Sequence, residues 1–234
     1  MPVFCVILVE PRYSGNIGLV ARCMKNFGIK DLYLVKPCAI DDDARRRAVH
    51  AQEIVDNARI FDSFEEALKE IDYAVATSSI TVENEKAFLR KAISLREFVN
   101  EIKDFKGKVG LIFGREDYGL FNHEIAKCDA LVTIPTSEKY RSLSLSHAVA
   151  IFLYEIFASG YSEERKERNI GYTEKKTMYR YFEEILDLIE YPSHKLERMK
   201  VVFRRVMGRA KLTIWEYHTL MGVMSEIVRR LKSR

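Results

Sequence analysis

The sequence has no apolar run long enough to cross a membrane. Its opening run, residues 3–9, ends at Glu10 and is far shorter than the about 18 to 20 apolar residues that a membrane-spanning helix needs. This start also lacks the basic segment and the small-residue cleavage site of a secretory signal. We therefore expect a cytoplasmic protein in which residues 3–9 form a buried strand.

Cysteine is scarce and scattered. The four cysteines, Cys5, Cys23, Cys38 and Cys128, form no C-x-x-C pair, and none has a histidine at ligand spacing. Neither a disulfide framework nor a zinc site is indicated, so we expect no metal. Three of the four lie in apolar segments, where a free thiol packs as a small hydrophobic group.

Excess positive charge is absent from the first two thirds of the chain. Residues 1–160 carry 21 Lys+Arg against 23 Asp+Glu, whereas residues 161–234 carry 17 against 11. This asymmetry favours a polyanionic partner for the C-terminal part, and a basic solvated helix is the alternative. The charge distribution alone does not show whether this partner is a nucleic acid.

Apolar runs of strand length alternate with segments of helical period up to residue 160. This pattern predicts an α/β domain with a mainly parallel sheet over residues 1–160. A charged linker over residues 161–172 and a helical extension over residues 173–234 follow. We expect strands at 3–9, 32–35, 73–77, 109–113 and 131–134, and helices at 17–27, 43–57, 64–71, 95–105, 123–128, 146–158, 173–190, 194–207 and 213–231.

Loops after the strands are where ligands bind in open α/β sheets, at the carboxyl ends of the strands. After the first strand, Gly15 and Gly18 allow a tight turn, and the helix that follows directs free N–H groups at an anion, so this loop resembles a phosphate cradle. Its spacing is G-x-x-G and not the dinucleotide-binding G-x-G-x-x-G, which argues against an NAD-binding fold.

Two further loops are ambiguous when each is taken by itself. Residues 114–119 contain Arg115 and Glu116, for which a surface turn with an ion pair between the two is the simpler interpretation. Residues 134–149 are polar before they become apolar, and Ser142, Ser144 or Ser146 could cap the helix that begins there.

Taken together, the three loops resemble one family. The motifs are N-x-G-x-x-x-R at residues 16–22, I-F-G-R-E-x-x-G-L at 112–120, and I-P at 134–135 followed by S-L-S-L-S-H-A-V-A-I at 142–151. This set resembles the SPOUT class of RNA methyltransferases, and within it the tRNA 2′-O-methyltransferases of the TrmH and TrmJ type. Residues 203–213 and the positions that follow are similar to the C-terminal extension of the TrmJ type.

The resemblance implies a sheet whose C-terminal segment forms a trefoil knot, a homodimer formed through the knot, and a site completed by the partner subunit. It also implies S-adenosylmethionine as the cofactor and tRNA as the partner, with 2′-O-methylation of cytidine, or of cytidine and uridine, at position 32 of the anticodon loop. The implied cofactor contacts are Thr77, Ser78, Ser79, Gly114, Ile134, Arg141, Ser142 and Leu143. The implied catalytic residues are Arg22, Asn16, Ser142 and Glu116.

Because a guanidinium stays protonated in proteins, we expect Arg22 to clamp an RNA phosphate and not to act as a base. Contacts to RNA are expected from Arg12, Lys139, Arg204, Arg205, Arg209 and Lys211. Packing of the extension on the first domain is the alternative role for its helices.

The third motif departs from the family pattern, because Ser144 stands where an asparagine is expected. Three alternatives therefore stay open at this point. They are a ribose methyltransferase for another tRNA or rRNA site, an RNA-binding knotted protein that lost turnover through Ser144, and a nucleotide-binding regulator that uses the loop at Gly15 and Gly18.

Overall fold

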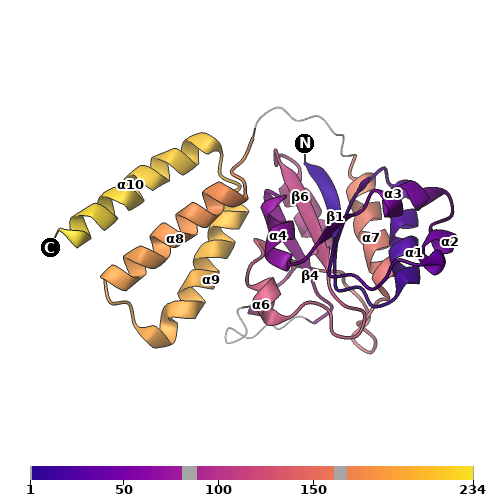
Figure 1. The fold of residues 1–234 in the computed structure, drawn as a ribbon. Coiled ribbons are helices and arrows are strands. Elements are labelled where there is room, and N and C mark those ends of the chain that lie inside the picture. Colours follow the sequence, from indigo (N-terminus) through magenta and orange to yellow (C-terminus); the bar gives the residue numbers. More distant parts are fainter. Residues whose placement is uncertain (1, 81–88, 161–167, 234) are drawn as a thin grey trace.

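A seven-stranded sheet forms the centre of the first domain. The computed structural model (Figure 1) describes residues 2–80, 89–160 and 168–233. Every strand pair in it is parallel, with the order β3-β2-β1-β6-β4-β7-β5. The strands are β1 (Val3–Val9), β2 (Asp31–Val35), β3 (Arg59–Phe61), β4 (Tyr73–Thr77), β5 (Ile93–Ser94), β6 (Lys108–Phe113) and β7 (Ala130–Thr133). The predicted α/β class and the five predicted strands are confirmed.

Helices cover both faces of this sheet. They are α1 (Ser14–Asn26), α2 (Asp42–Ala48), the 3₁₀ turn η1 (Val49–Ala51), α3 (Gln52–Asp56), α4 (Phe64–Lys69), α5 (Leu95–Ile102), α6 (Asn122–Ile125) and α7 (Leu145–Ala158). One core joins the sheet to α1, α3, α5 and α7, and a second core on the other face joins it to α4 and α6. Alternate strand residues supply the two cores, so β1 is apolar along its whole length.

The single helix expected over residues 43–57 is wrong. The chain breaks there into α2, η1 and α3, and Val49 has a positive φ of 52° at the break. A β-branched residue rarely adopts that conformation, so the uninterrupted helical pattern of the sequence gave no sign of it.

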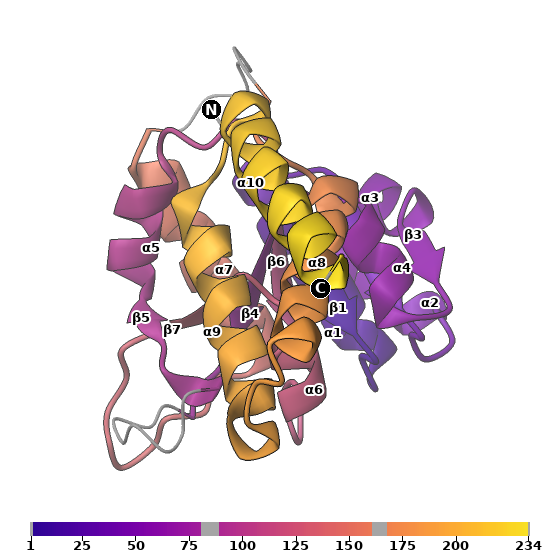
Figure 2. The same ribbon diagram turned by 90° about the vertical axis from the view of Figure 1, so that its left-hand side faces the viewer.

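The C-terminal helices form a separate layer beside the sheet. α8 (Tyr172–Leu188), α9 (Ser193–Ala210) and α10 (Ile214–Lys232) lie together at one side of the α/β domain, with a small core around Met178, Tyr179 and Tyr217 (Figure 1). The view from that side shows α9 and α8 in front of the sheet (Figure 2). Most of the expected linker, residues 161–167, lies outside the described residues.

Buried polar contacts attach these helices to the α/β domain. The carboxylate of Asp129 accepts hydrogen bonds from Lys175 Nζ at 2.7 Å and from the backbone N–H of Ala74 at 2.8 Å. Gly208 of α9 packs directly on Asp129, because a Cβ at this glycine would lie 2.6 Å from the Asp129 Cβ. Specific contacts therefore hold the extension on the α/β domain.

Candidate active site

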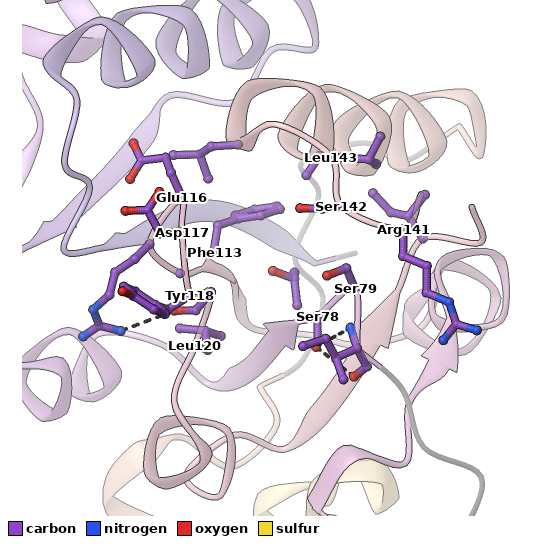
Figure 3. Close-up of a pocket in the computed structure, with 18 of the residues that line it drawn as sticks. Ser78, Ser79, Phe113, Glu116, Asp117, Tyr118, Leu120, Arg141, Ser142 and Leu143 are labelled. Atoms are coloured by element: carbon purple, nitrogen blue, oxygen red, sulfur yellow. Dashed lines mark hydrogen bonds between the residues drawn. The ribbon is translucent and has the colours of Figure 1, made fainter. Parts of the chain in front are cut away.

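One pocket lies at the carboxyl ends of β6, β4 and β7. It has a volume of about 470 Å³, within the range of small-molecule sites. Figure 3 shows its wall side chains, which come from the segment after β4, the loop after β6 and the loop that precedes α7. These three segments meet because their strands are neighbours in the sheet, with Val75 of β4 beside both Leu111 and Ala130.

The structure brings every expected cofactor contact to this pocket. Its lining includes Thr77, Ser78, Ser79, Gly114, Ile134, Arg141, Ser142 and Leu143. The apolar part of the lining includes Phe113, Val132, Leu145, Ala148 and Phe152. An apolar floor with hydroxyl and backbone groups at the rim suits a ligand that combines an aromatic ring with polar substituents.

A buried ion cluster fixes the loop after β6. Arg115 donates to Glu124 through both terminal nitrogens, at 3.1 and 3.0 Å, and to Glu10 through Nε at 2.9 Å. Burial disfavours the charged guanidinium, but the hydrogen bonds to Glu10 and Glu124 outweigh it and raise the pKa of Arg115. The expected ion pair between Arg115 and Glu116 is therefore wrong, because Arg115 turns inward.

The same loop closes on itself next to the pocket. Arg115 and Gly119 exchange backbone hydrogen bonds of 3.2 and 2.8 Å. A Cβ on Gly114 would lie 2.1 Å from the carbonyl carbon of Gly119, so only glycine fits at this position. Gly119 itself has a φ of 65°. Both glycines thus shape the wall of the pocket.

Glu116 connects the pocket to the first motif. Its carboxylate accepts hydrogen bonds from Asn16 Nδ2 at 2.8 Å and from the backbone N–H of Arg12 at 3.0 Å. Arg12 also forms an exposed ion pair with Asp117 at 2.7 Å. Asn16, Glu116 and Ser142 are therefore close to one pocket, although only Glu116 and Ser142 line it.

Arg22 lies outside that pocket in its own chain. Its side chain is exposed on α1, and it makes no hydrogen bond or ion pair within the described part of the chain. The neighbouring Cys23 lies 3.7 Å (Sγ to O) from the carbonyl of Ser146, which places this part of α1 beside the start of α7. Within one subunit, the structure does not bring Arg22 to the expected cofactor contacts.

An apolar surface continues from this region along α7. Ile151, Tyr154 and Phe157 are exposed, with Tyr154 at 58% and Phe157 at 61%. Both aromatic rings contact Phe27, which follows α1, at centroid distances of 6.3 and 5.8 Å. We call this surface, formed by Phe27, Ile151, Tyr154 and Phe157, the α1/α7 face.

Gly15 and Gly18 do not form a phosphate cradle. Both are buried within α1, and a Cβ at Gly18 would lie 2.0 Å from the carbonyl oxygen of Ala44 in α2. A Cβ at Gly15 would meet the carboxylate of Asp43. The glycines instead allow α1 and α2 to pack closely. The structure therefore gives no support to the alternative of a regulator that binds the phosphate of a nucleotide at this loop.

Ser144 is the residue before α7 and does not line the pocket. Its hydroxyl contacts Nδ1 of His147, one turn into the helix. The departure from the family asparagine therefore affects the first turn of α7, and not the wall where the cofactor contacts are expected.

The residues expected to bind RNA are divided by the structure. Arg12, Lys139 and Arg209 are exposed. Arg204, Arg205 and Lys211 are half-buried: Arg204 lies over the ring of Tyr179 at 4.4 Å, and Arg205 donates to the carbonyl of Leu89. Arg204 and Arg205 therefore also make contacts within the protein, and phosphate binding by the six residues stays a prediction.

Sequence reasoning missed two groups around the pocket. Arg90 lines it but stands in no motif. Glu10 and Glu124, the partners of Arg115, are 105 and 9 residues away along the chain, so no local signal identified them. No group of three or more potential metal ligands occurs in the described segments, and none of their helices is long and apolar enough to span a membrane.

Comparisons with known proteins agree with this geometry. The model of the SpoU rRNA Methylase family matches residues 3–154. A curated relative from Methanocaldococcus jannaschii, a tRNA (cytidine-2'-O-)-methyltransferase TrmJ, is 43% identical over 222 residues, covering 93% of this chain and 96% of the relative. The crystal structure of TrmJ from Z. mobilis ZM4 is 28% identical, with a TM-score of 0.77, covering 96% of this chain and 99% of that one. A structure on the 2-OH methylation of C/U34 on tRNA is 28% identical, with a TM-score of 0.54, and covers 68% of this chain and 97% of that one.

Proposed function

The chain belongs to the SpoU rRNA methylase family, and from this premise we propose that it methylates a ribose 2′-hydroxyl of tRNA with S-adenosylmethionine, at position 32 of the anticodon loop. The observation that carries the proposal is the pocket at the ends of β4, β6 and β7, which gathers all the expected cofactor contacts. Similarity to TrmJ proteins over nearly the whole chain, C-terminal helices included, supports tRNA as the substrate.

The pocket fits the chemistry of S-adenosylmethionine. The apolar side chains of Phe113, Val132 and Phe152 would cover the adenine, and the hydroxyl and backbone groups of residues 77–79 and 141–143 would bind the polar groups. The carboxylates of Glu116 and Asp117 at the rim favour a cationic ligand. The bound cofactor would supply an electrophilic methyl group carried on a sulfonium. After transfer of the methyl group, the rest of the cofactor would be a neutral thioether.

Residues of this chain would then align and activate the ribose. Asn16 and Glu116 are held together by a 2.8 Å hydrogen bond, so the rim next to Ser142 is preorganised for a hydroxyl. The adjacent RNA phosphate would accept the proton of the 2′-hydroxyl as the 2′-oxygen takes the methyl group from the sulfonium sulfur, which would leave as a neutral thioether. Arg22 binds that phosphate and stabilises the developing charge, because its guanidinium keeps its proton.

Arg22 would act in the pocket of a second subunit. It is exposed and does not line the pocket of its own chain. The α1/α7 face next to it presents Ile151, Tyr154 and Phe157 to solvent, and exposed apolar patches mark protein interfaces. A twofold dimer through this face would bury the patch and give each pocket the arginine of the partner. The trefoil knot stays a prediction of the family resemblance.

Mixing two inactive variants tests the shared site. Arg22→Ala removes the arginine, and Ser142→Ala alters the pocket. If equal amounts exchange subunits at random, about one quarter of the sites combine an intact pocket with an intact Arg22 from the partner, so activity returns to about that fraction. A mixture as inactive as its components would show that Arg22 acts in its own subunit.

The transfer of labelled methyl groups to unmodified tRNA transcripts tests the function itself. Nuclease digestion and mass spectrometry would locate the product, and a 2′-O-methyl group at position 32 is expected. A product at position 34 would instead align the activity with the 2-OH methylation of C/U34, the subject of a structure that covers 68% of this chain. Labelling of ribosomal RNA and not of tRNA would refute the proposed substrate.

A further inference from the structure

The C-terminal helices contact a segment that lines the pocket. Figure 2 shows α9 in front of the sheet near β7, with which it makes contact. From this helix, Arg205 donates a hydrogen bond to the carbonyl oxygen of Leu89. Burial lowers the pKa of Arg205, as expected for a cation enclosed at the junction of two parts of the protein. Arg205 therefore connects α9 to the segment at Leu89.

The residue after Leu89 reaches the pocket directly. Arg90 lines the pocket, and its Nη1 donates to Ser78 Oγ at 3.2 Å while its Nε donates to Asn122 Oδ1 at 3.2 Å. Ser78 Oγ also donates to the carbonyl of Ile80 at 2.9 Å and accepts from the Ile80 N–H at 3.0 Å. Arg90 therefore joins the segment after β4 to the start of α6.

We propose that Arg205 is a positioning residue for the cofactor pocket: it fixes the backbone at Leu89, so that Arg90 is held against Ser78 and that wall is preformed. A wall that is already ordered does not have to lose freedom when the cofactor binds, so the affinity is higher. The inference rests on the proposed function, because it takes S-adenosylmethionine as the ligand of this pocket.

The neighbouring cations of α9 do not make this contact. Arg204 lies over the ring of Tyr179 at 4.4 Å, and Arg209 is exposed. Arg198, on the same helix, is exposed as well. Of these four arginines, Arg205 makes the contact with Leu89, so Arg198→Ala is a matched control that removes the same side chain from the same helix.

Binding of S-adenosylmethionine to the full chain, measured by titration calorimetry without RNA, tests the inference. Arg205→Ala should weaken binding about fivefold to tenfold, at the lower end of the range for coupled sites. Arg205→Lys keeps a charged donor for the Leu89 carbonyl and should stay within about twofold of the unaltered protein, as should Arg198→Ala. Circular dichroism melting of each variant checks that the helices are folded.

The outcomes separate the inference from the proposed function. Unchanged affinity in Arg205→Ala, with the unaltered protein binding the cofactor, would overturn the inference alone. Equal weakening by Arg205→Ala and Arg205→Lys would also overturn it, because the donor would then not be what matters. Absence of binding by the unaltered protein would overturn the proposed cofactor and the inference with it.

Discussion

Replacing Glu124 with alanine tests whether the buried ion cluster holds the pocket loop. The side chains of Glu124 and Arg115 are each only 4% exposed. The variant removes both hydrogen bonds between them, and also the 2.7 Å bond from the Phe121 N–H that begins α6. Breaking a buried pair from one side costs about 3 to 5 kcal/mol, because a buried charge loses its partner.

The lower end of that range applies here, because Glu10 still accepts from Arg115 at 2.9 Å. Its side chain is 43% exposed, so it compensates only in part. We expect a loss of about 3 kcal/mol in the free energy of unfolding, which lowers the urea midpoint by about 1 M if the slope is about 3 kcal/mol/M.

A matched control distinguishes the loss of a buried ion pair from the loss of an exposed one. Glu65→Ala removes a carboxylate from an ion pair with Lys127, whose side chains are 49% and 36% exposed, and should cost less than about 1 kcal/mol. Urea unfolding followed by circular dichroism would compare the two variants. A Glu124→Ala loss no larger than that of the control would refute the argument that the cluster fixes the loop.

Three further predictions concern packing, thiols and charge. Gly18→Ala should lower the melting temperature, because its Cβ meets the backbone of α2, whereas Gly222→Ala has open space and should be stabilising by about 0.4 to 1 kcal/mol. Burial raises the pKa of Cys5 to about 12 and also raises the pKa of Cys128, so alkylation followed by mass spectrometry should leave both unmodified at neutral pH until the protein unfolds. Arg22→Lys keeps the charge but loses the planar fork, so we expect kcat/KM for tRNA to fall at least about tenfold, and near-normal turnover would contradict the clamp.

The sequence predicted the centre of the fold better than its edges. The five predicted strands are long apolar runs, whereas the two missed strands lie at the ends of the sheet. β3 has two exposed residues of three, and β5 has only two residues, so neither has an apolar pattern to detect. Edge strands depend on their neighbour for hydrogen bonds more than on their own composition.

Site residues were predicted where a motif placed them, and their partners were not. The pair Gly15 and Gly18 fits both a tight turn and close helix packing, because each requires only the absence of a Cβ. Likewise, the charge of Arg205 does not show which side of α9 faces the protein. Such questions depend on contacts between distant segments, which a single sequence does not contain.

The place of β6 in the sheet determines when the protein can fold during synthesis. β1 pairs with β2 on one side and with β6 on the other, where Val3 lies opposite Lys108. The second edge of β1 therefore stays without its partner strand until β6 has been synthesised. An unpaired edge of an apolar strand is prone to aggregation while the chain is incomplete. Contacts of such large sequence separation also slow folding. In the nascent chain, the β6 side of β1 therefore has no partner strand until residues 108–113 have left the ribosome.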